Sequence, residues 1–444
     1  MADINGFVPP AKADSPHHIA FPGFEAVFRT PWSVEPVVEI GVSELDISKS
    51  LRLSDRHMAI YETVSLYSNP IQKRLHEDDL QVDLWFVIIP EEVFLLGRPQ
   101  SRVRRDEQIR TVSKMNSQLA RKLRVQPSLF AEDMKAADIY EHDLDFHHQL
   151  KARLLSSKAV VQIVREPALA TDQVDERTGL KRRMQDPATV AWNLCATAFF
   201  KAGGRPWKLA HVRERVCYIG LVFKKSRSGA DSRNACCGAQ MFLDSGDGLV
   251  FKGAMGPWYS PDTKEFHLTK DEAQRLVETV VRSYIEETGA PPNELFIHGR
   301  TRFNQEEWDG FRAAAPPATN VVCIRIRRTR DMKLFRDGTT PVLRGTMYRV
   351  NKKRALIWTM GYIPFLATYP GREVPNPLSI EVSQGEADIQ AVAHDILRLT
   401  KLNFNACIYG DGLPVTLRFA DAVGEILMAA PNDNTPPLPF RHYI

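Results

Sequence analysis

Continuous apolar runs and amphipathic segments follow one another along most of the chain. VDLWFVIIP (82–90) and AVVQIVRE (159–166) have the length and apolar character of strands buried on both faces. Between them, DLDFHHQLKARLLSS (143–157) places its leucines near helical spacing. This strand, helix, strand order predicts a parallel crossover.

The rest of the chain continues the pattern. The segment 187–204 contains a helix, with Pro187 near its start and Gly203 just past its end. Beyond it we predict strands at 216–225, 294–301, 320–330, 342–350 and 354–362, a hairpin at 239–253 that turns at 245–248, and helices at 269–289, 304–314, 386–402 and 414–430. Strands in pairs followed by helices favour an α/β fold with a mixed sheet.

The first 75 residues show little periodicity. They begin Pro-rich, and EPVVEIGVSELDI (35–47) is a possible strand. The last segment, PPLPFRHYI (436–444), forms an apolar, aromatic tail.

Composition narrows the class of protein. The chain has 444 residues, 43% of them apolar and 25% charged, which predicts a globular protein of two or three domains. A net charge of +4 is too small to attract nucleic acid without local clustering. The six cysteines form no CxxC pair, which favours a protein with reduced cysteines. No signal peptide is recognisable and no apolar run reaches the length of a membrane span, so we expect a cytoplasmic protein.

One cluster of polar residues suggests an anion site. His147 and Lys151 lie four residues apart and therefore share a helix face, Gln162 lies on the following strand, and Lys201 ends the next helix. These residues suit a phosphate cup. From spacing alone, we favour the ordinary interpretation, in which His147 and Lys151 lie on a solvated helix face and Gln162 is a hydrogen-bonded strand residue.

Arginine and lysine are also concentrated in three stretches, at 102–110, 201–215 and 325–330. In IRIRRTR, Arg325, Arg327 and Thr329 alternate onto one strand face, and a row of charges there would suit a phosphate backbone. A charged sheet edge is the alternative. The chain has no G-x-S-x-G, P-loop, GxGxxG or H-E-x-x-H motif.

Ordered sequence blocks from about residue 82 to residue 444 carry a resemblance to a known family. They include VDLWFVIIPEEV, DFHHQLKARLL, QIVRE, FFKAGGRPWKLA, CYIGLVF, ELFIHGRTRFNQEEWDGF, IWTMGYIP, PNPLSIEVSQGEADI, LTKLNFNACIYGDGLPVTLRFADAVGEIL and PPLPFRHYI. Together they resemble the short prokaryotic Argonautes. The resemblance implies an N-terminal extension (1–75), a Rossmann-like MID domain (76–190) and an RNase H-like PIWI domain (191–444).

The same resemblance implies a guide-binding site. In the family, residues at the positions of His147, Lys151, Gln162 and Lys201 surround the 5′-phosphate of a guide strand. A divalent cation, expected to be Mg²⁺, is held there partly by the chain's C-terminal carboxylate. In this sequence the resemblance implies that the carboxylate of Ile444 and the side chain of Gln162 are the metal ligands. The cation offsets the repulsion between carboxylate and phosphate.

Cleaving members of the family hold two Mg²⁺ ions with acidic residues of PIWI. At the first two of these positions, this chain carries Val222 and Arg300, and only Asp421 remains acidic. Neither an aliphatic side chain nor a guanidinium binds Mg²⁺, so we expect no cleavage and a structural role for Asp421.

The resemblance therefore implies a non-enzymatic sensor that binds a 5′-phosphorylated guide RNA and recognises complementary single-stranded DNA of invaders. Its expected partner is a protein that contains an APAZ region fused to a TIR domain, a sirtuin-like domain or a nuclease. The two chains are expected to form a heterodimer, which assembles further on activation and acts in abortive-infection defence. Two alternatives stay open. One is a guided endonuclease with displaced acidic residues such as Asp244 and Asp247, and the other is a guide-independent nucleic-acid binder.

Overall fold

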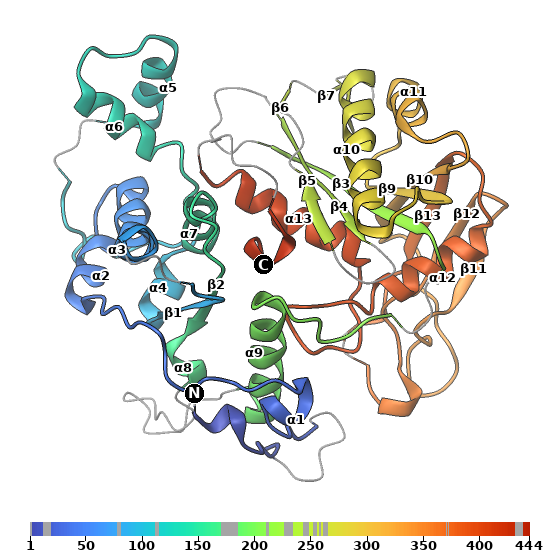
Figure 1. The fold of residues 1–444 in the computed structure, drawn as a ribbon, viewed down its shortest axis with the longest axis horizontal. Coiled ribbons are helices and arrows are strands. Elements are labelled where there is room, and N and C mark those ends of the chain that lie inside the picture. The colour runs from blue at the N-terminus through green and yellow to red at the C-terminus, as the bar shows by residue number, and fades with distance from the viewer. Residues whose placement is uncertain are drawn as a thin grey trace.

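The computed structural model divides into two lobes, and the helix α9 (Pro187–Lys201) lies between them (Figure 1). It describes residues 2–11, 19–77, 81–111, 115–169, 185–209, 213–225, 234–242, 248–251, 255–256, 259–260, 265–369, 371, 373–430 and 438–444. The α/β class predicted from the sequence is confirmed. Among the described helices, none combines the length and apolar character that a transmembrane span requires.

The first lobe is built around two parallel strands, β1 (Trp85–Ile89) and β2 (Val161–Arg165), paired from Trp85 with Val161 to Ile89 with Arg165. Their pairing confirms the predicted crossover. The helices of this lobe are α2 (Glu44–Leu51), α3 (Arg56–Glu77), α4 (Glu91–Leu96), α5 (Ser117–Val125), α6 (Ala131–Ile139), α7 (Phe146–Leu154) and α8 (Glu166–Leu169).

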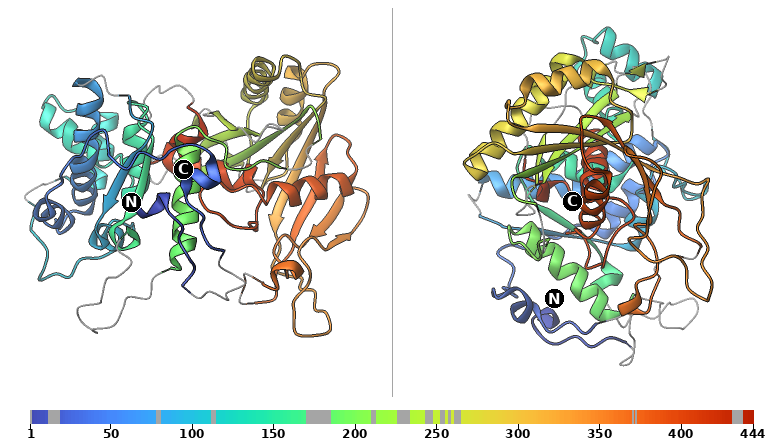
Figure 2. Two further views of the ribbon diagram at one scale, coloured as in Figure 1. Left: turned by 60° about the horizontal axis from the view of Figure 1, so that its bottom comes forward. Right: turned by 90° about the vertical axis from the view of Figure 1, so that its right-hand side faces the viewer.

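Residues predicted to form an N-terminal extension contribute to the core of this lobe. Ile60 and Val64 of α3 are fully buried beside Val87 of β1 and Leu150 of α7. Earlier in the chain, η1 (Ala2–Asn5) and α1 (Phe24–Phe28) lie near α9 (Pro187–Lys201), and their apolar residues share a cluster with it (Figure 2). The predicted boundaries at 75 and 190 both fall within helices, α3 and α9.

The strand predicted at 35–47 is wrong. Residues 35–43 form no strand, and α2 starts directly after Ser43. The Ser43 side chain accepts a hydrogen bond from the Asp46 amide, and Glu44 and Asp46 place negative charge in the first turn. These capping features favour a helix start over a strand at this point.

The second lobe contains a nine-stranded sheet. Its strand order is β11-β12-β13-β10-β9-β3-β4-β5, with β6 also paired to β4. The strands are β3 (Val216–Lys225), β4 (Asn234–Phe242), β5 (Gly248–Phe251), β6 (Met255–Gly256), β9 (Glu294–Gly299), β10 (Asn320–Arg328), β11 (Met347–Arg349), β12 (Arg354–Ile357) and β13 (Leu378–Gln384), while β7 (Tyr259–Ser260) and β8 (Glu265–Phe266) pair separately.

The central strand β9 is parallel to β3 and β10, whereas β4 and β13 run antiparallel to their neighbours. The sheet is therefore mixed, as predicted. The antiparallel pairing of β4 with β5 confirms the predicted hairpin, although its turn and the candidates Asp244 and Asp247 lie outside the described residues.

Helices cover both faces of this sheet (Figures 1 and 2). Apolar residues of α10 (Lys270–Thr288) and α11 (Gln305–Ala314) cluster with one face, and those of α12 (Ile389–Leu399) and α13 (Val415–Leu427) cluster with the other. Two short helical turns complete the lobe, η2 (Pro364–Leu366) and η3 (Phe440–His442).

Candidate nucleic-acid interface

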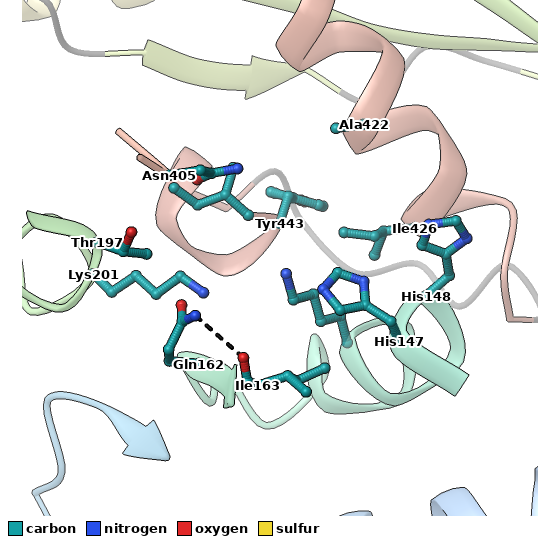
Figure 3. Close-up of a pocket in the computed structure, with 12 residues that line it drawn as sticks. His147, His148, Gln162, Ile163, Thr197, Lys201, Asn405, Ala422, Ile426 and Tyr443 are labelled. Atoms are coloured by element: carbon teal, nitrogen blue, oxygen red, sulfur yellow. Dashed lines mark hydrogen bonds between the residues drawn. The ribbon is translucent and has the colours of Figure 1, made fainter. Parts of the chain in front are cut away.

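A cavity of about 190 Å³ lies where the two lobes meet (Figure 3). Its lining comes from α7 and β2 of the first lobe, from α9, and from α13 and the C-terminus of the second lobe. The lining residues are His147, His148, Lys151, Gln162, Ile163, Thr197, Lys201, Asn405, Ala422, Ile426, Tyr443 and Ile444. All five residues singled out from the sequence as phosphate ligands thus line one cavity.

The start of α7 sets the direction of two of these side chains. Asp145 caps the helix by accepting a hydrogen bond from the His148 amide, 3.1 Å away. Phe146 and Leu150 are buried in the core of the first lobe. The opposite face of α7 therefore points toward the cavity, which His147 (Figure 3) and Lys151 both line.

Two lysine ammonium groups are buried in this cavity. Lys151 is 3% exposed and Lys201 is 1% exposed, and the Lys201 Nζ donates a 2.6 Å hydrogen bond to the carbonyl of Val161. Among the described residues, neither lysine lies within ion-pair distance of a carboxylate. An anionic ligand would therefore supply the ion-pair partner that both buried amino groups lack.

Desolvation lowers the pKa of Lys151, of Lys201 and of His147. Desolvation lowers the pKa of Lys151 to about 7. The pKa of Lys201 falls well below its ordinary value through desolvation and then through repulsion by Lys151. For His147, which keeps solvent exposure at the cavity, desolvation followed by the charge of Lys151 lowers the pKa well below its usual range, so the imidazole is neutral at pH 7.

The opposite wall is the end of the chain. Phe440 stacks on Phe419 of α13 with ring centroids 4.1 Å apart, and Tyr443 and Ile444 are 2% and 5% exposed. The tail is thereby packed into the core of the second lobe, and the terminal residue is held at the cavity.

Gln162 supplies an oxygen acceptor to the same cavity. Its Nε2 donates to the Ile163 carbonyl at 3.3 Å, whereas its buried Oε1 has no hydrogen-bond partner among the described atoms. Gln162 and Ile444 both line the cavity, and an unpaired amide oxygen is a ligand type that suits Mg²⁺.

Sequence reasoning missed part of the cavity lining. Thr197 lies one turn before Lys201 on α9, so its position was available from helical spacing. Asn405 comes from a loop, where no periodic signal exists.

Of the row of charges predicted on β10, part is paired with carboxylates of the protein itself. Arg325 is 14% exposed and pairs with Glu265 at 2.8 Å and with Glu381 at 3.6 Å, so its charge is compensated within the protein. Arg213, from another of the basic stretches, pairs in the same way with Asp395 and Glu294. Among the described residues of this stretch, the exposed Arg327, Arg328 and Arg330 fit the prediction of a charged surface.

The three positions that the resemblance compares with the acidic residues of cleaving Argonautes, Val222, Arg300 and Asp421, lie on β3, after β9 and on α13. Val222 is 3% exposed within the core. The Asp421 carboxylate lies 2.5 Å from Lys224 Nζ and 3.2 Å from Arg300 Nη2, and Lys224 also contacts Glu425 at 2.7 Å. Desolvation by burial lowers the pKa of Lys224. Hydrogen bonds to Asp421 and Glu425 raise it by more, so the pKa of Lys224 is above its ordinary value.

Comparisons with known proteins identify the fold. No protein-family model matches the sequence, and neither does any curated protein sequence. Among solved structures, Clostridium butyricum Argonaute bound to a guide DNA and a 19-mer target DNA is similar over 72% of this chain, with 17% identity and a TM-score of 0.52. Aa-Ago with externally bound siRNA is similar over 88% of this chain, with 13% identity and a TM-score of 0.50.

The chain spans 40% and 44% of the lengths of these two structures. At this identity the likeness shows the fold, which is that of an Argonaute with a Rossmann-like MID lobe followed by an RNase H-like PIWI lobe. The predicted fold is thus confirmed.

The buried lysines predict an unusual pH dependence of stability. Because the pKa of Lys151 is lower in the folded protein than in the unfolded chain, the unfolded chain holds the proton more tightly between pH 7 and 10. The free energy of unfolding of nucleic-acid-free protein should therefore rise with pH in this window, by up to about 1.4 kcal/mol per pH unit for each such lysine. Denaturant titrations at several pH values measure this slope.

Lys151→Met isolates the contribution of one lysine, because methionine keeps the length of the side chain without its charge. We expect Lys151→Met to be more stable than the unmodified protein at pH 7 and to show a shallower slope. The exposed Lys270 on α10 provides a matched control, and Lys270→Met should leave both quantities unchanged. Equal slopes for the Lys151 variant and the unmodified protein would contradict the burial argument.

Proposed function

We propose that this chain binds the 5′-phosphorylated end of a guide RNA in the cavity between its lobes and uses the guide to recognise complementary single-stranded DNA. One observation carries the proposal: Lys151 and Lys201 are buried together without a carboxylate partner, at a cavity that both lobes line. A terminal phosphate carries about −1.5 to −2 charges, enough to compensate both ammonium groups. The similar Argonaute structures contain guide and target DNA or siRNA, which supports a nucleic acid as the source of that phosphate.

Binding of phosphate would restore the charge of the lysines. An anion next to Lys151 and Lys201 favours their protonated forms, so it opposes the desolvation that lowers their pKa. His147 and Gln162 add neutral hydrogen-bonding groups. A 5′-hydroxyl would leave the ammonium groups unpaired and should bind far more weakly.

A divalent cation fits the same cavity. The unpaired Oε1 of Gln162 and the terminal carboxylate of Ile444 are the oxygen donors that would hold Mg²⁺. Such an ion would supply positive charge between the carboxylate and the phosphate.

We propose further that the chain does not cleave the target. At the acidic site, the Asp421 carboxylate is paired with Lys224 and Arg300, and Val222 offers no ligand atom. Side-chain cations thus lie where a cleaving enzyme would require metal ions. Effector chemistry would then belong to a partner, which the resemblance suggests is an APAZ-containing subunit with a TIR or sirtuin-like domain acting in abortive-infection defence.

The central experiment compares guides that differ only in the 5′ group. Replacing His147 and Lys151 together by alanine should weaken binding of 5′-phosphorylated RNA by about 3 to 6 kcal/mol, since each charge-assisted hydrogen bond contributes about 1.5 to 3 kcal/mol. Binding of 5′-hydroxyl RNA should change little. Fluorescence anisotropy with both guides measures the difference, with Lys270→Ala as the charge-matched control, and equal losses for both guides would refute the phosphate assignment.

The terminal carboxylate allows a test that leaves every native side chain in place. Adding two glycines after Ile444 moves the carboxylate away from the cavity. We expect the extended protein to bind 5′-phosphorylated RNA equally with Mg²⁺ and with EDTA, whereas the native chain should bind it more tightly with Mg²⁺. A Mg²⁺ effect of the same size in both proteins would place the ion elsewhere.

The absence of cleavage is tested directly. Purified protein loaded with phosphorylated guide and mixed with labelled complementary DNA should leave the target intact in Mg²⁺ and in Mn²⁺. Denaturing gels would detect a product. A specific cut opposite the guide, removed when Asp421 is replaced by alanine, would show instead that the chain is a nuclease.

A further inference from the structure

The first turn of α7 brings two histidines and a carboxylate together at the mouth of the cavity. The ligand atoms of Asp145, His147 and His148 all lie within 4.8 Å of one another. His147 is exposed, and the side chains of Asp145 and His148 are 21% and 24% exposed, so an ion from solvent can reach all three.

A second carboxylate adjoins this group. Asp143 Oδ2 lies 3.4 Å from His148 Nδ1, and the Asp143 side chain is only 6% exposed. Asp143 and Asp145 together contribute two negative charges, which equal the charge of a divalent ion. This matters because the positive end of the helix dipole at the N-terminus of α7 disfavours a cation.

Imidazole ligands select a different ion from the one expected at the terminal carboxylate. Oxygen donors suit Mg²⁺, whereas imidazole nitrogen suits Zn²⁺ and other divalent transition metals. We propose that Asp145, His147 and His148 form a binding site for a divalent transition metal ion, represented by Zn²⁺, which is separate from the Mg²⁺ site at Gln162 and Ile444.

The location of the site has a consequence for the cavity. His147 belongs both to the metal cluster and to the cavity lining, so a bound ion would lie close to the place where the phosphate is proposed to bind. Its positive charge should strengthen phosphate binding, and by linkage the phosphate should strengthen metal binding. The metal site itself does not depend on the proposed function, whereas this coupling does.

The test of the site is a titration of untagged, nucleic-acid-free protein with Zn²⁺, followed by calorimetry. We expect one ion per chain, and at least about tenfold weaker binding in His148→Ala and in Asp145→Asn. Asparagine is as good a helix cap as aspartate, so Asp145→Asn removes the charge while it retains α7. His394→Ala, which removes an exposed histidine of α12, is the matched control and should bind as the unmodified protein does.

Co²⁺ provides a second readout, because its visible absorption responds to the coordinating atoms. The spectrum of the bound ion should be lost in His148→Ala and kept in His394→Ala. Equal Zn²⁺ affinity in all four proteins, or equal loss in the variant and its control, would overturn the proposal.

The coupling is tested separately with guide RNA. Zn²⁺ should tighten binding of 5′-phosphorylated RNA to the unmodified protein and have no effect on His148→Ala. If Zn²⁺ binds but does not change guide affinity, the site stands and the coupling fails. If the protein does not distinguish phosphate from hydroxyl guides even without metal, the proposed function fails while the metal titration remains valid.

Discussion

Two buried ammonium groups without a carboxylate partner impose the main constraint on this structure. Burial disfavours the charged form of both amino groups and so lowers the pKa of Lys151 and of Lys201, and repulsion by Lys151 lowers the pKa of Lys201 further. Packing in the two lobes must supply the free energy that holds them in place. A protein that retains such an arrangement has a cavity already organised for an anion, since little rearrangement is needed when the anion arrives.

The end of the chain completes that cavity because aromatic packing fixes it. Phe440 stacks on Phe419, and the remaining tail residues are buried in the core of the second lobe. The tail closes the cavity against α9, and the two lobes therefore share one site through α7, α9 and the terminal residues.

The sequence was most informative where a local pattern determines structure. Continuous apolar runs identified β1 and β2, and the spacing of His147 and Lys151 placed both on one helix face. The helix α3 was missed because its buried face includes Thr63 and Ser68, which weaken the apolar periodicity. The compensation of Arg325 was also invisible, because Glu265 and Glu381 are distant in sequence and become neighbours only in the folded sheet.

The cavity and the acidic site differ in how their charges are paired, and the contrast connects the proposed binding with the proposed loss of cleavage. In the cavity, two basic side chains are buried without a carboxylate within ion-pair distance, which leaves them without a charged partner. At the acidic site, Lys224 and Arg300 face Asp421 and Glu425, so two positive charges meet two negative ones and the group needs neither metal nor phosphate. Of the two sites, the cavity is therefore the one whose basic side chains lack carboxylate partners within ion-pair distance, which is why we propose it as the place that holds the end of the guide.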